Sequence, residues 1–305
     1  MKKLTSFAAI LIVMVCFCFV PSIAQNLAAP YLQFSTSAEA SAYGNAFTSL
    51  ADDASATYWN PAGLATIEGY SFVGMVSAGL GLDRNFNAGS VAFNMAKQGV
   101  LGISFSTSGV SNIQGYDENG LKTNSFNVVN IVPGISYAFK ATNDISTGVT
   151  MRYIRQNLDV QVDNGYAFDA GFRYQMGTTQ KIFTSAVVQN LFGKVGVNKL
   201  PQILRLGIGS VFQGAFTGGL DYVVEDISNS KSLKYFNVGV GYQMNFQDVS
   251  VAARTGFNNG QDFSAGFGVG MNIQGLVARI DYAYVTEPSQ LFTSSHRIGI
   301  SIVGK

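Results

Sequence analysis

From Tyr70 onward, apolar residues alternate with small or polar residues in short segments. In the segment 276–284 the even-numbered residues are Leu, Ala, Ile, Tyr and Tyr, whereas the odd-numbered residues are Val, Arg, Asp and Ala. The segments 235–244, 262–273 and 296–303 alternate in the same way. Successive side chains of a β-strand point to opposite faces, so one face of each strand is suited to lipid and the other to a lumen. The pattern predicts about 14 strands of about ten residues each.

These strands predict an all-β fold, a transmembrane antiparallel β-barrel. An even number of strands closes such a barrel, and closure leaves no unpaired backbone groups in lipid. A soluble β-sandwich or propeller is the alternative, and its second face would be rich in Lys, Glu, Thr and Asn. Here that face carries mainly Gly, Ser and single charges, which favours a barrel because glycine leaves room in a crowded lumen. Asp163-Asn164-Gly165 predicts one short turn, and a longer polar connection is expected at 109–124.

The first 24 residues have the pattern of a secretory signal peptide. Two lysines precede an apolar stretch from Phe7 to Val20, and small residues at Ser22 and Ala24 predict cleavage after Ala24. A single transmembrane anchor is the alternative, but the apolar stretch is short for one. Both cysteines of the chain lie in this stretch, so the mature chain is expected to have no disulfide and no thiolate site.

Candidate chemistry is sparse. Charged residues make up only 12% of the chain and the formal net charge is +1, so no basic face predicts a nucleic-acid partner. The one histidine, His296, has the parity of the lipid face of the last strand. A hydrolase would need it to converge with a serine and Asp281, but adjacent residues of a strand point apart. Metal-ligand pairs, phosphate loops and cofactor motifs are lacking, so we predict no enzyme, cofactor or metal site.

The segment before the first strand carries the densest motif of the chain, Ala51-Asp-Asp-Ala-Ser-Ala-Thr-Tyr-Trp-Asn-Pro-Ala-Gly-Leu64. Carboxylates accept free backbone N–H groups, so the two aspartates can cap a turn. The Asn-Pro pair favours a turn, and Gly63 permits a conformation that other residues avoid. A capped helix end leading into the first strand is the plainer interpretation. The residues expected where this segment meets the barrel are Asp52, Asp53, Trp59, Asn60, Pro61, Ala62 and Gly63.

We therefore divide the chain into a signal peptide (1–24), an N-terminal plug (25–69) and a barrel (70–305). Charged residues recur on the small-residue faces of the barrel strands. Buried charges need partners, so we expect Arg–Asp ladders along the lumen wall. These ladders would brace and fill the barrel; ion selectivity is the alternative. The residues are Arg152, Asp169, Arg173, Arg205, Asp221, Arg254, Arg279, Asp281 and Arg297.

The motif from Leu50 to Leu64, preceded by Ala42-Tyr-Gly-Asn-Ala-Phe47, resembles the N-terminal signature of the PorV/PorQ family. That family belongs to the wider FadL-like outer-membrane barrels, which share the Asn-Pro-Ala element. Weaker matches follow downstream, such as Ile280-Asp-Tyr-Ala-Tyr284. The resemblance covers nearly the whole mature chain. It implies a 14-stranded barrel in the bacterial outer membrane, surrounded by its lipid.

The resemblance implies two alternative roles. PorV-like members serve type IX protein secretion, where they bind the C-terminal signal domain of secreted cargo and carry it between machinery proteins. That role predicts protein partners, a lumen blocked by the plug, and exposed apolar loop residues such as Leu291 and Phe292 or others within 109–124. FadL itself is a diffusion channel for long-chain fatty acids, so this alternative predicts a hydrophobic ligand, an apolar lumen pocket and a kink or gap in the wall. The polar, glycine-rich inner face favours the secretion role.

Overall fold

The signal peptide predicted for residues 1–24 lies outside the part of the chain that the computed structural model describes. Leu291 and Phe292, which we expected in an exposed loop, lie outside it as well. Among the residues that are described, no helix is long and apolar enough to cross a membrane. The described residues are 29–78, 81, 83–177, 181–227, 232–258, 262–286 and 294–305.

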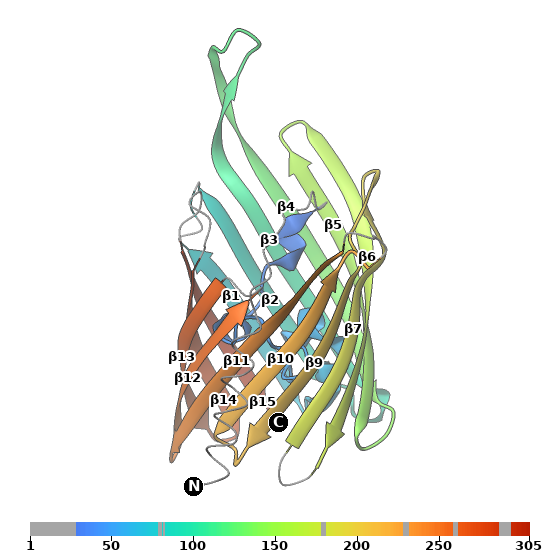
Figure 1. The fold of residues 1–305 in the computed structure, drawn as a ribbon, viewed down its shortest axis with the longest axis vertical. Helices are drawn as coiled ribbons and strands as arrows, with labels where there is room; N and C mark the ends of the chain where they lie inside the picture. Colours follow the sequence, from blue (N-terminus) through green and yellow to red (C-terminus); the bar gives the residue numbers. More distant parts are fainter. Residues whose placement is uncertain are drawn as a thin grey trace.

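Antiparallel strands make up most of the chain after the N-terminal segment (Figure 1). The alternating sequence gives each strand two different faces. In β1 (Tyr70–Ala78), Val73 and Met75 are buried, whereas Phe72 and Val76 are exposed on the outside. The other strands are β2 (Arg84–Asn94), β3 (Val100–Tyr116), β4 (Lys122–Lys140), β5 (Ile145–Leu158), β6 (Gln161–Met176), β7 (Lys181–Val195), β8 (Asn198–Lys199), β9 (Ile203–Phe212), β10 (Phe216–Glu225), β11 (Leu233–Phe246), β12 (Val249–Asn258), β13 (Asp262–Ile273), β14 (Leu276–Val285) and β15 (Ser295–Gly304).

The strands form one continuous sheet that closes on itself. The first strand, β1, pairs with the last, β15, and β6 pairs with β7 to complete the ring. The short β8 only forms a hairpin with the end of β7, so the wall has 14 long strands. This confirms the predicted all-β barrel. The short turns β2–β3, β4–β5, β9–β10, β11–β12 and β13–β14 lie at the end where β1 starts; we call it the turn end and the opposite one the loop end.

Large apolar side chains cover the outside of the barrel. Ile280 is 61% exposed and Phe267 is 54% exposed, although both lie in the middle of strands. A soluble protein would bury such residues, whereas lipid favours them. The apolar exterior and the closed wall identify the chain as a barrel of the bacterial outer membrane, where short turns face the periplasm.

Two connections differ from those predicted. The region 109–124 is mostly strand, because β3 and β4 continue as a paired hairpin that projects from the loop end (Figure 1). A strand outside the membrane needs no apolar face, so alternation could not reveal it. The predicted turn at Asp163-Asn164-Gly165 is wrong, because these residues lie inside β6. The chain instead turns at Asp159 and Val160, and Asp159 takes the left-handed φ of 57°.

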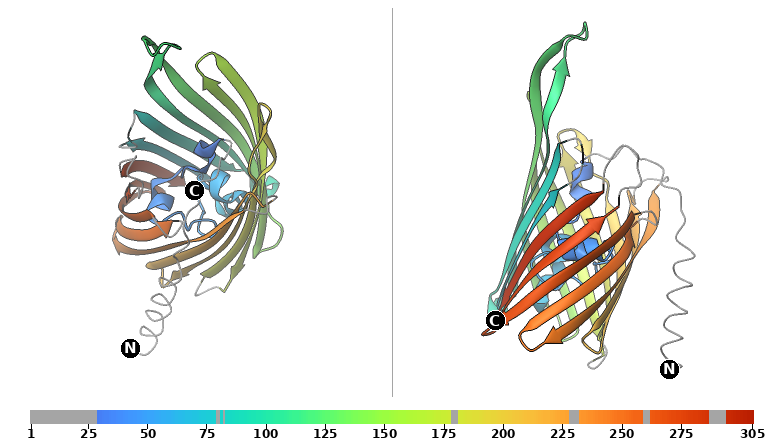
Figure 2. Two further views of the ribbon diagram at one scale, coloured as in Figure 1. Left: turned by 45° about the horizontal axis from the view of Figure 1, so that its top comes forward. Right: turned by 90° about the vertical axis from the view of Figure 1, so that its left-hand side faces the viewer.

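Residues 29–69 lie inside the barrel and lead directly into β1 (Figure 2). The helices of this segment are short, because glycine, proline and capping serines interrupt the chain. Ser37, for example, begins a helix by accepting a hydrogen bond from the backbone N–H of Ala40. The helical elements are η1 (Pro30–Gln33), α2 (Ala38–Ala42), α3 (Ala56–Trp59), η2 (Pro61–Thr66) and, in the turn after β2, η3 (Ala96–Gln98).

Candidate functional site

The described part of the N-terminal segment, residues 29–69, is called the plug from here on, and it follows the inner wall around the barrel. Residues 38–50 pass the strands from β15 to β9, and residues 57–64 pass the strands from β6 to β3. Glycines of the wall face the plug along this path, and a Cβ atom on any of them would lie within 3.0 Å of plug atoms. These inward-facing glycines therefore mark places where the plug lies against the wall. They are Gly299, Gly266, Gly256, Gly241, Gly239, Gly219, Gly209, Gly171, Gly148 and Gly102.

Asn60 joins two parts of the plug to the wall, and its side chain is fully buried. Its Oδ1 accepts a hydrogen bond from the backbone N–H of Ala62 at 3.1 Å, which caps η2. Its Nδ2 donates to the carbonyl of Thr48 at 3.0 Å and to the carbonyl of Phe172 in β6 at 3.3 Å. Pro61 follows at the first position of η2, where its missing N–H is not needed.

Trp59 fills the centre of the plug and is 1% exposed. Its ring makes edge contacts with Tyr58 at 5.1 Å and with Phe47 at 6.1 Å between centroids. From the wall, the guanidinium of Arg205 lies over the ring at 5.5 Å. Arg205 also donates to Gln189, whose own amide donates to the carbonyl of Tyr58. The tryptophan is therefore held by the plug on one side and by a wall arginine on the other.

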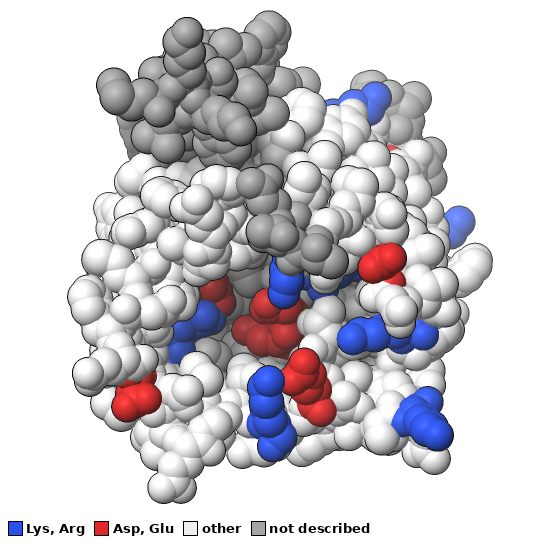
Figure 3. Space-filling view, turned by 90° about the horizontal axis from the view of Figure 1, so that it is seen from below, with Lys and Arg blue, Asp and Glu red and all other residues white. Residues whose placement is uncertain are grey.

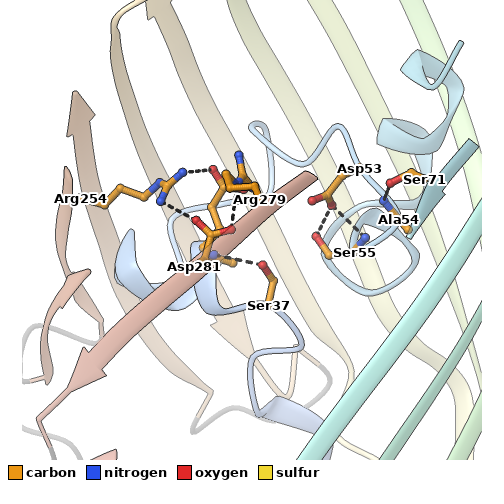
Figure 4. A network of polar contacts seen from close by, with 10 residues as sticks. Ser37, Asp53, Ala54, Ser55, Ser71, Arg254, Arg279 and Asp281 are labelled. Carbon is orange, nitrogen blue, oxygen red and sulfur yellow. Dashed lines mark hydrogen bonds and ion pairs between the residues drawn. The ribbon is translucent and has the colours of Figure 1, made fainter. Parts of the chain in front are cut away.

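Asp53 organises the turn before α3 (Figure 4). Its Oδ1 accepts hydrogen bonds from the backbone N–H and the hydroxyl of Ser55, and Ser71 of β1 accepts one from the N–H of Ala54. Burial raises the pKa of Asp53 to about 7, with the neighbouring acids adding to the effect. Asp52, in contrast, is exposed, and its carboxylate caps no helix. Capping therefore involves one aspartate of the pair.

Gly63 is required for a different reason from the one predicted. It lies in η2 without a left-handed φ, so the expected unusual conformation is wrong. A Cβ atom at this position would instead collide with the carbonyl oxygen of Ala51. The left-handed glycine of the plug is Gly44, with a φ of 62°, and it packs on the backbone of Phe257 in β12.

Four charged side chains tie α2 to the wall (Figure 4). Glu39 pairs with Arg254 at 3.0 Å and with Arg279, and both arginines also pair with Asp281, at 2.8 and 2.7 Å. Burial opposes the charge of Glu39, but the two guanidinium groups hold the pKa of this carboxyl below its usual range. Arg297 donates to a serine hydroxyl of the same helix at 2.7 Å. From the turn end, acidic and basic residues are visible in the opening of the barrel (Figure 3).

A second charged cluster lies between β5, β6 and β7. Arg152 pairs with Asp169 at 2.7 Å and donates to the amide oxygen of Asn190 at 2.9 Å. Asp169 also accepts the backbone N–H of Asn190, and the amide of Asn190 donates to the carbonyl of Pro201. The cluster holds the loop end of β7 against the next connection.

The predicted Arg–Asp pairs are formed in these two clusters, between Arg152 and Asp169 and between Asp281 and both Arg254 and Arg279. Asp221, Arg173 and Arg205 take part in no ion pair among the described residues. Asp221 accepts the hydroxyl and the backbone N–H of Thr48 in the plug, and Arg173 donates to the carbonyl of Ser49. These wall charges lack Arg–Asp partners because the plug supplies polar groups instead, and the alternation of a strand cannot reveal them.

An apolar patch lines the inner wall toward the loop end, above the glycine path. Its members come from β4 to β7 and the connection after β8, and η1 covers them. A cavity of about 30 Å³ lies beside it, lined by Tyr31, Phe34, Phe86 and Arg152 among others. The inner face is therefore not uniformly polar, which corrects our expectation for this half of the lumen. The apolar patch consists of Val132, Ile154, Ala167, Val195 and Leu200, with Ala29, Leu32 and Tyr31 of the plug.

The wall is kinked next to this patch. Asn190 and Phe192 of β7 have left-handed φ values of 61° and 54°, which non-glycine residues rarely adopt. The pairing of β7 with β6 shifts register on both sides of Phe168. An extra residue in one strand leaves part of the ladder unpaired and bends the wall. Phe192 is 78% exposed at the outer side of the bend.

Within the described ranges, no group of three His, Cys, Asp or Glu side chains is arranged to hold a metal ion. His296 is exposed on β15, where it shares a hydrogen bond of 2.7 Å with the hydroxyl of Tyr282.

Sequence reasoning missed several residues that join plug and wall. Glu39 and Thr48 lie in the Ala/Ser-rich stretch that the strand pattern did not cover. Gln189 and Asn190 are two polar residues in a row that interrupt the alternation of β7. This interruption was the sequence signal for the register shift between β7 and β6.

No protein-family model matches the chain, and no curated protein matches it in sequence. Solved structures do match it in fold. The toluene transporter TbuX of Ralstonia pickettii superposes with a TM-score of 0.59 at 12% identity, over 90% of this chain and 99% of that one. The toluene transporter TodX of Pseudomonas putida gives 0.55 at 12% identity, over 88% and 97%. A TodX mutant described as a monoaromatic hydrocarbon channel gives 0.58 at 11% identity, over 88% and 98%.

These likenesses are too distant in sequence to transfer a function, but they establish the architecture. The chain has the fold of these transporters, a 14-stranded antiparallel barrel whose N-terminal segment of short helices precedes the first strand.

Proposed function

We propose that this barrel passes small hydrophobic molecules across the outer membrane, with the plug as its closed gate. The observation that carries the proposal is the apolar patch inside the loop end, which ends at the kinked strand β7. A polar filter would need charged or hydroxyl groups at this position, whereas an apolar lining favours apolar ligands. A FadL-type role predicts an apolar pocket and a wall kink; the wall has the kink and an apolar lining, which η1 fills.

The barrel cannot act as a simple open pore, because the plug blocks its lumen. Fully buried plug residues such as Trp59, Asn60 and Leu64 fill the part toward the turn end, so passage requires the plug to move or the ligand to leave through the wall. η1 covers the apolar patch mainly through apolar contacts, together with one hydrogen bond from Gln33 to Glu225 of 3.3 Å. Its displacement would join the small cavity to the apolar patch. The structural likeness to TbuX and TodX, both toluene transporters, supports the same class of ligand.

An uptake assay tests this role with two matched leucine substitutions. Leu200→Asn places an amide in the apolar patch, where Leu200 is 5% exposed, and Leu121→Asn changes the hairpin tip, where Leu121 is 65% exposed. Uptake of radiolabelled toluene by cells that carry the chain should fall several-fold with Leu200→Asn and remain unchanged with Leu121→Asn. Equal uptake by both variants and by cells that lack the chain would refute the transport role.

Protein secretion is the second candidate, and the long β3–β4 hairpin supports it. The hairpin extends beyond the neighbouring strands, since β2 pairs with β3 only up to Val110 and β4 pairs with β5 only from Val128. Its tip exposes Tyr116 and Leu121, and its free strand edges suit docking of another protein. A PorV-like carrier would bind the C-terminal signal domain of cargo there, together with secretion-machinery proteins. Leu121→Asn should then weaken co-purification of such proteins while Leu200→Asn does not.

The segments named from the sequence enter both proposals. We propose that residues 1–24 are the export signal, residues 25–69 the N-terminal gate segment and residues 70–305 the barrel. Asp53 and Asn60 hold the plug, and the paired arginines and acids of the wall lock α2 and β7 in place.

A further inference from the structure

A groove crosses the outer, lipid-facing surface of β14, β15, β1, β2 and β3. Its volume is about 550 Å³, which lies within the range of about 300–1,000 Å³ for sites that hold small molecules. The wall strands reveal its origin. Cross-strand neighbours form a row in which Ile280 pairs with Ile300, Ile300 with Gly74, Gly74 with Gly89, and Gly89 with Phe105. Two adjacent glycines between large apolar side chains leave a trough.

The floor of the trough is open over Gly89, whereas the side chains of Phe72 and Ile300 lie within 3.6 Å of a Cβ placed on Gly74. A Cβ atom added to Gly89 would have one neighbour within 4 Å, the carbonyl oxygen of Val73 at 3.9 Å. The sides and the end toward the turns are apolar and exposed, since Phe105 is 49%, Ile300 42% and Phe72 37% exposed. This surface faces the membrane interior. A polar group placed in the trough would lose its hydrogen bonds to water, so an apolar group is the favoured occupant.

The end toward the loops differs in chemistry. Val76 pairs with Asn87 and Asn87 pairs with Thr107, one row nearer the loop end than the glycines. Both Asn87 and Thr107 line the groove. An amide and a hydroxyl beside an apolar trough provide hydrogen-bond donors next to a site for a hydrocarbon chain. A membrane lipid of the outer leaflet has this combination, with an acyl chain below its ester or amide groups.

We propose that this trough is a specific binding site for one acyl chain of an outer-leaflet lipid, with Asn87 and Thr107 donating hydrogen bonds to the carbonyl groups at the head of that chain. The site is independent of the transport role, because it lies on the outside of the wall. A second copy of the barrel fits it less well. A protein neighbour would have to present one long protruding apolar side chain with a carbonyl acceptor at its base, whereas every lipid presents both.

The test measures how much lipid the barrel retains. Wild-type and variant barrels are reconstituted in phosphatidylethanolamine vesicles, extracted in mild detergent and weighed intact by native mass spectrometry. Gly89→Leu fills the trough, and the matched control Gly218→Leu adds the same side chain to the lipid-facing side of β10, where a Cβ atom meets nothing within 4 Å. Retention should fall about tenfold with Gly89→Leu, a loss of about 1.4 kcal/mol, and stay at the wild-type level with Gly218→Leu.

Heat-modifiable migration on a gel checks that each variant is folded. If Gly89→Leu does not fold, Phe105→Ala removes one side of the trough and should lower retention in the same way. Asn87→Leu should reduce retention while leaving the trough open. Unchanged retention in these variants, or a wild-type dimer without lipid that Gly89→Leu converts to a monomer, would overturn the proposal.

Discussion

Asn60→Ala should release the plug from the wall under conditions where the wild-type plug stays in place. The fully buried amide makes three hydrogen bonds, to Ala62, Thr48 and Phe172. Each such bond contributes about 0.5–1.5 kcal/mol net, and a buried group left without its partner costs about 1–3 kcal/mol. Alanine removes all three bonds at once, so the plug should lose about 3 kcal/mol of stability.

The single tryptophan of the chain allows a direct assay. Trp59 is 1% exposed and adjoins Asn60, so its fluorescence reports whether the plug is packed. Urea titration of the barrel in detergent should show a tryptophan transition at lower urea for Asn60→Ala, while heat-modifiable migration of the wall persists. Asn94→Ala is the matched control. Asn94 makes one hydrogen bond from its Nδ2 to the plug, 2.7 Å from the carbonyl of Ile67, so its loss should cost about 1 kcal/mol.

The comparison of the two variants decides the question. A transition of Asn60→Ala no earlier than that of Asn94→Ala would refute the view that the amide of Asn60 anchors the plug.

Three further predictions follow from the plug and its contacts. Gly219→Ala should destabilise the plug, because its Cβ would collide with a plug carbonyl, whereas Gly218→Ala on the same strand should be neutral in urea titrations. Burial raises the pKa of Asp53 from an ordinary value of about 3.9 to about 7. Between these two pH values the folded state therefore keeps a proton on Asp53 that the unfolded state has released. Plug stability from this group should therefore fall as pH rises from about 4 to about 7, and Asp53→Asn should remove that fall in urea midpoints measured across this range. Ala38→Cys and Gly299→Cys place two Cβ atoms 3.0 Å apart, so a disulfide forms after α2 shifts outward to the usual separation of about 3.8 Å. This disulfide should stop hydrocarbon uptake until it is reduced; uptake by the oxidised form would mean that α2 need not move further.

Much of the wall could be predicted from the sequence, because lipid and lumen impose opposite demands on alternate residues. In β15, for example, Ile298 and Ile300 face outward and alternate with Gly299 and Ser301, which face the lumen. The prediction failed for segments outside the membrane, where no such alternation is required. The β3–β4 hairpin outside the membrane has no apolar face to mark it, and Asp163-Asn164-Gly165 has turn-forming residues that β6 nevertheless accommodates.

The interior was harder to predict than the wall. Alternation identified Asp221 and Arg173 as inward-facing charges, but their partners are the backbone and hydroxyl groups of Thr48 and Ser49. These contacts join residues more than 120 positions apart, and the periodicity of a strand carries no information about them. The inward-facing glycines that contact the plug were the best sequence record of its path, because a side chain at these positions would collide with plug atoms.

The most direct test of the proposed role compares cells with and without the chain. Uptake of radiolabelled toluene and the yield of secreted surface proteins are measured in the same cultures. Our proposal predicts faster uptake with the chain present and an unchanged yield of secreted proteins. Equal uptake together with a loss of secreted proteins would contradict the transport role and favour a carrier of secreted cargo.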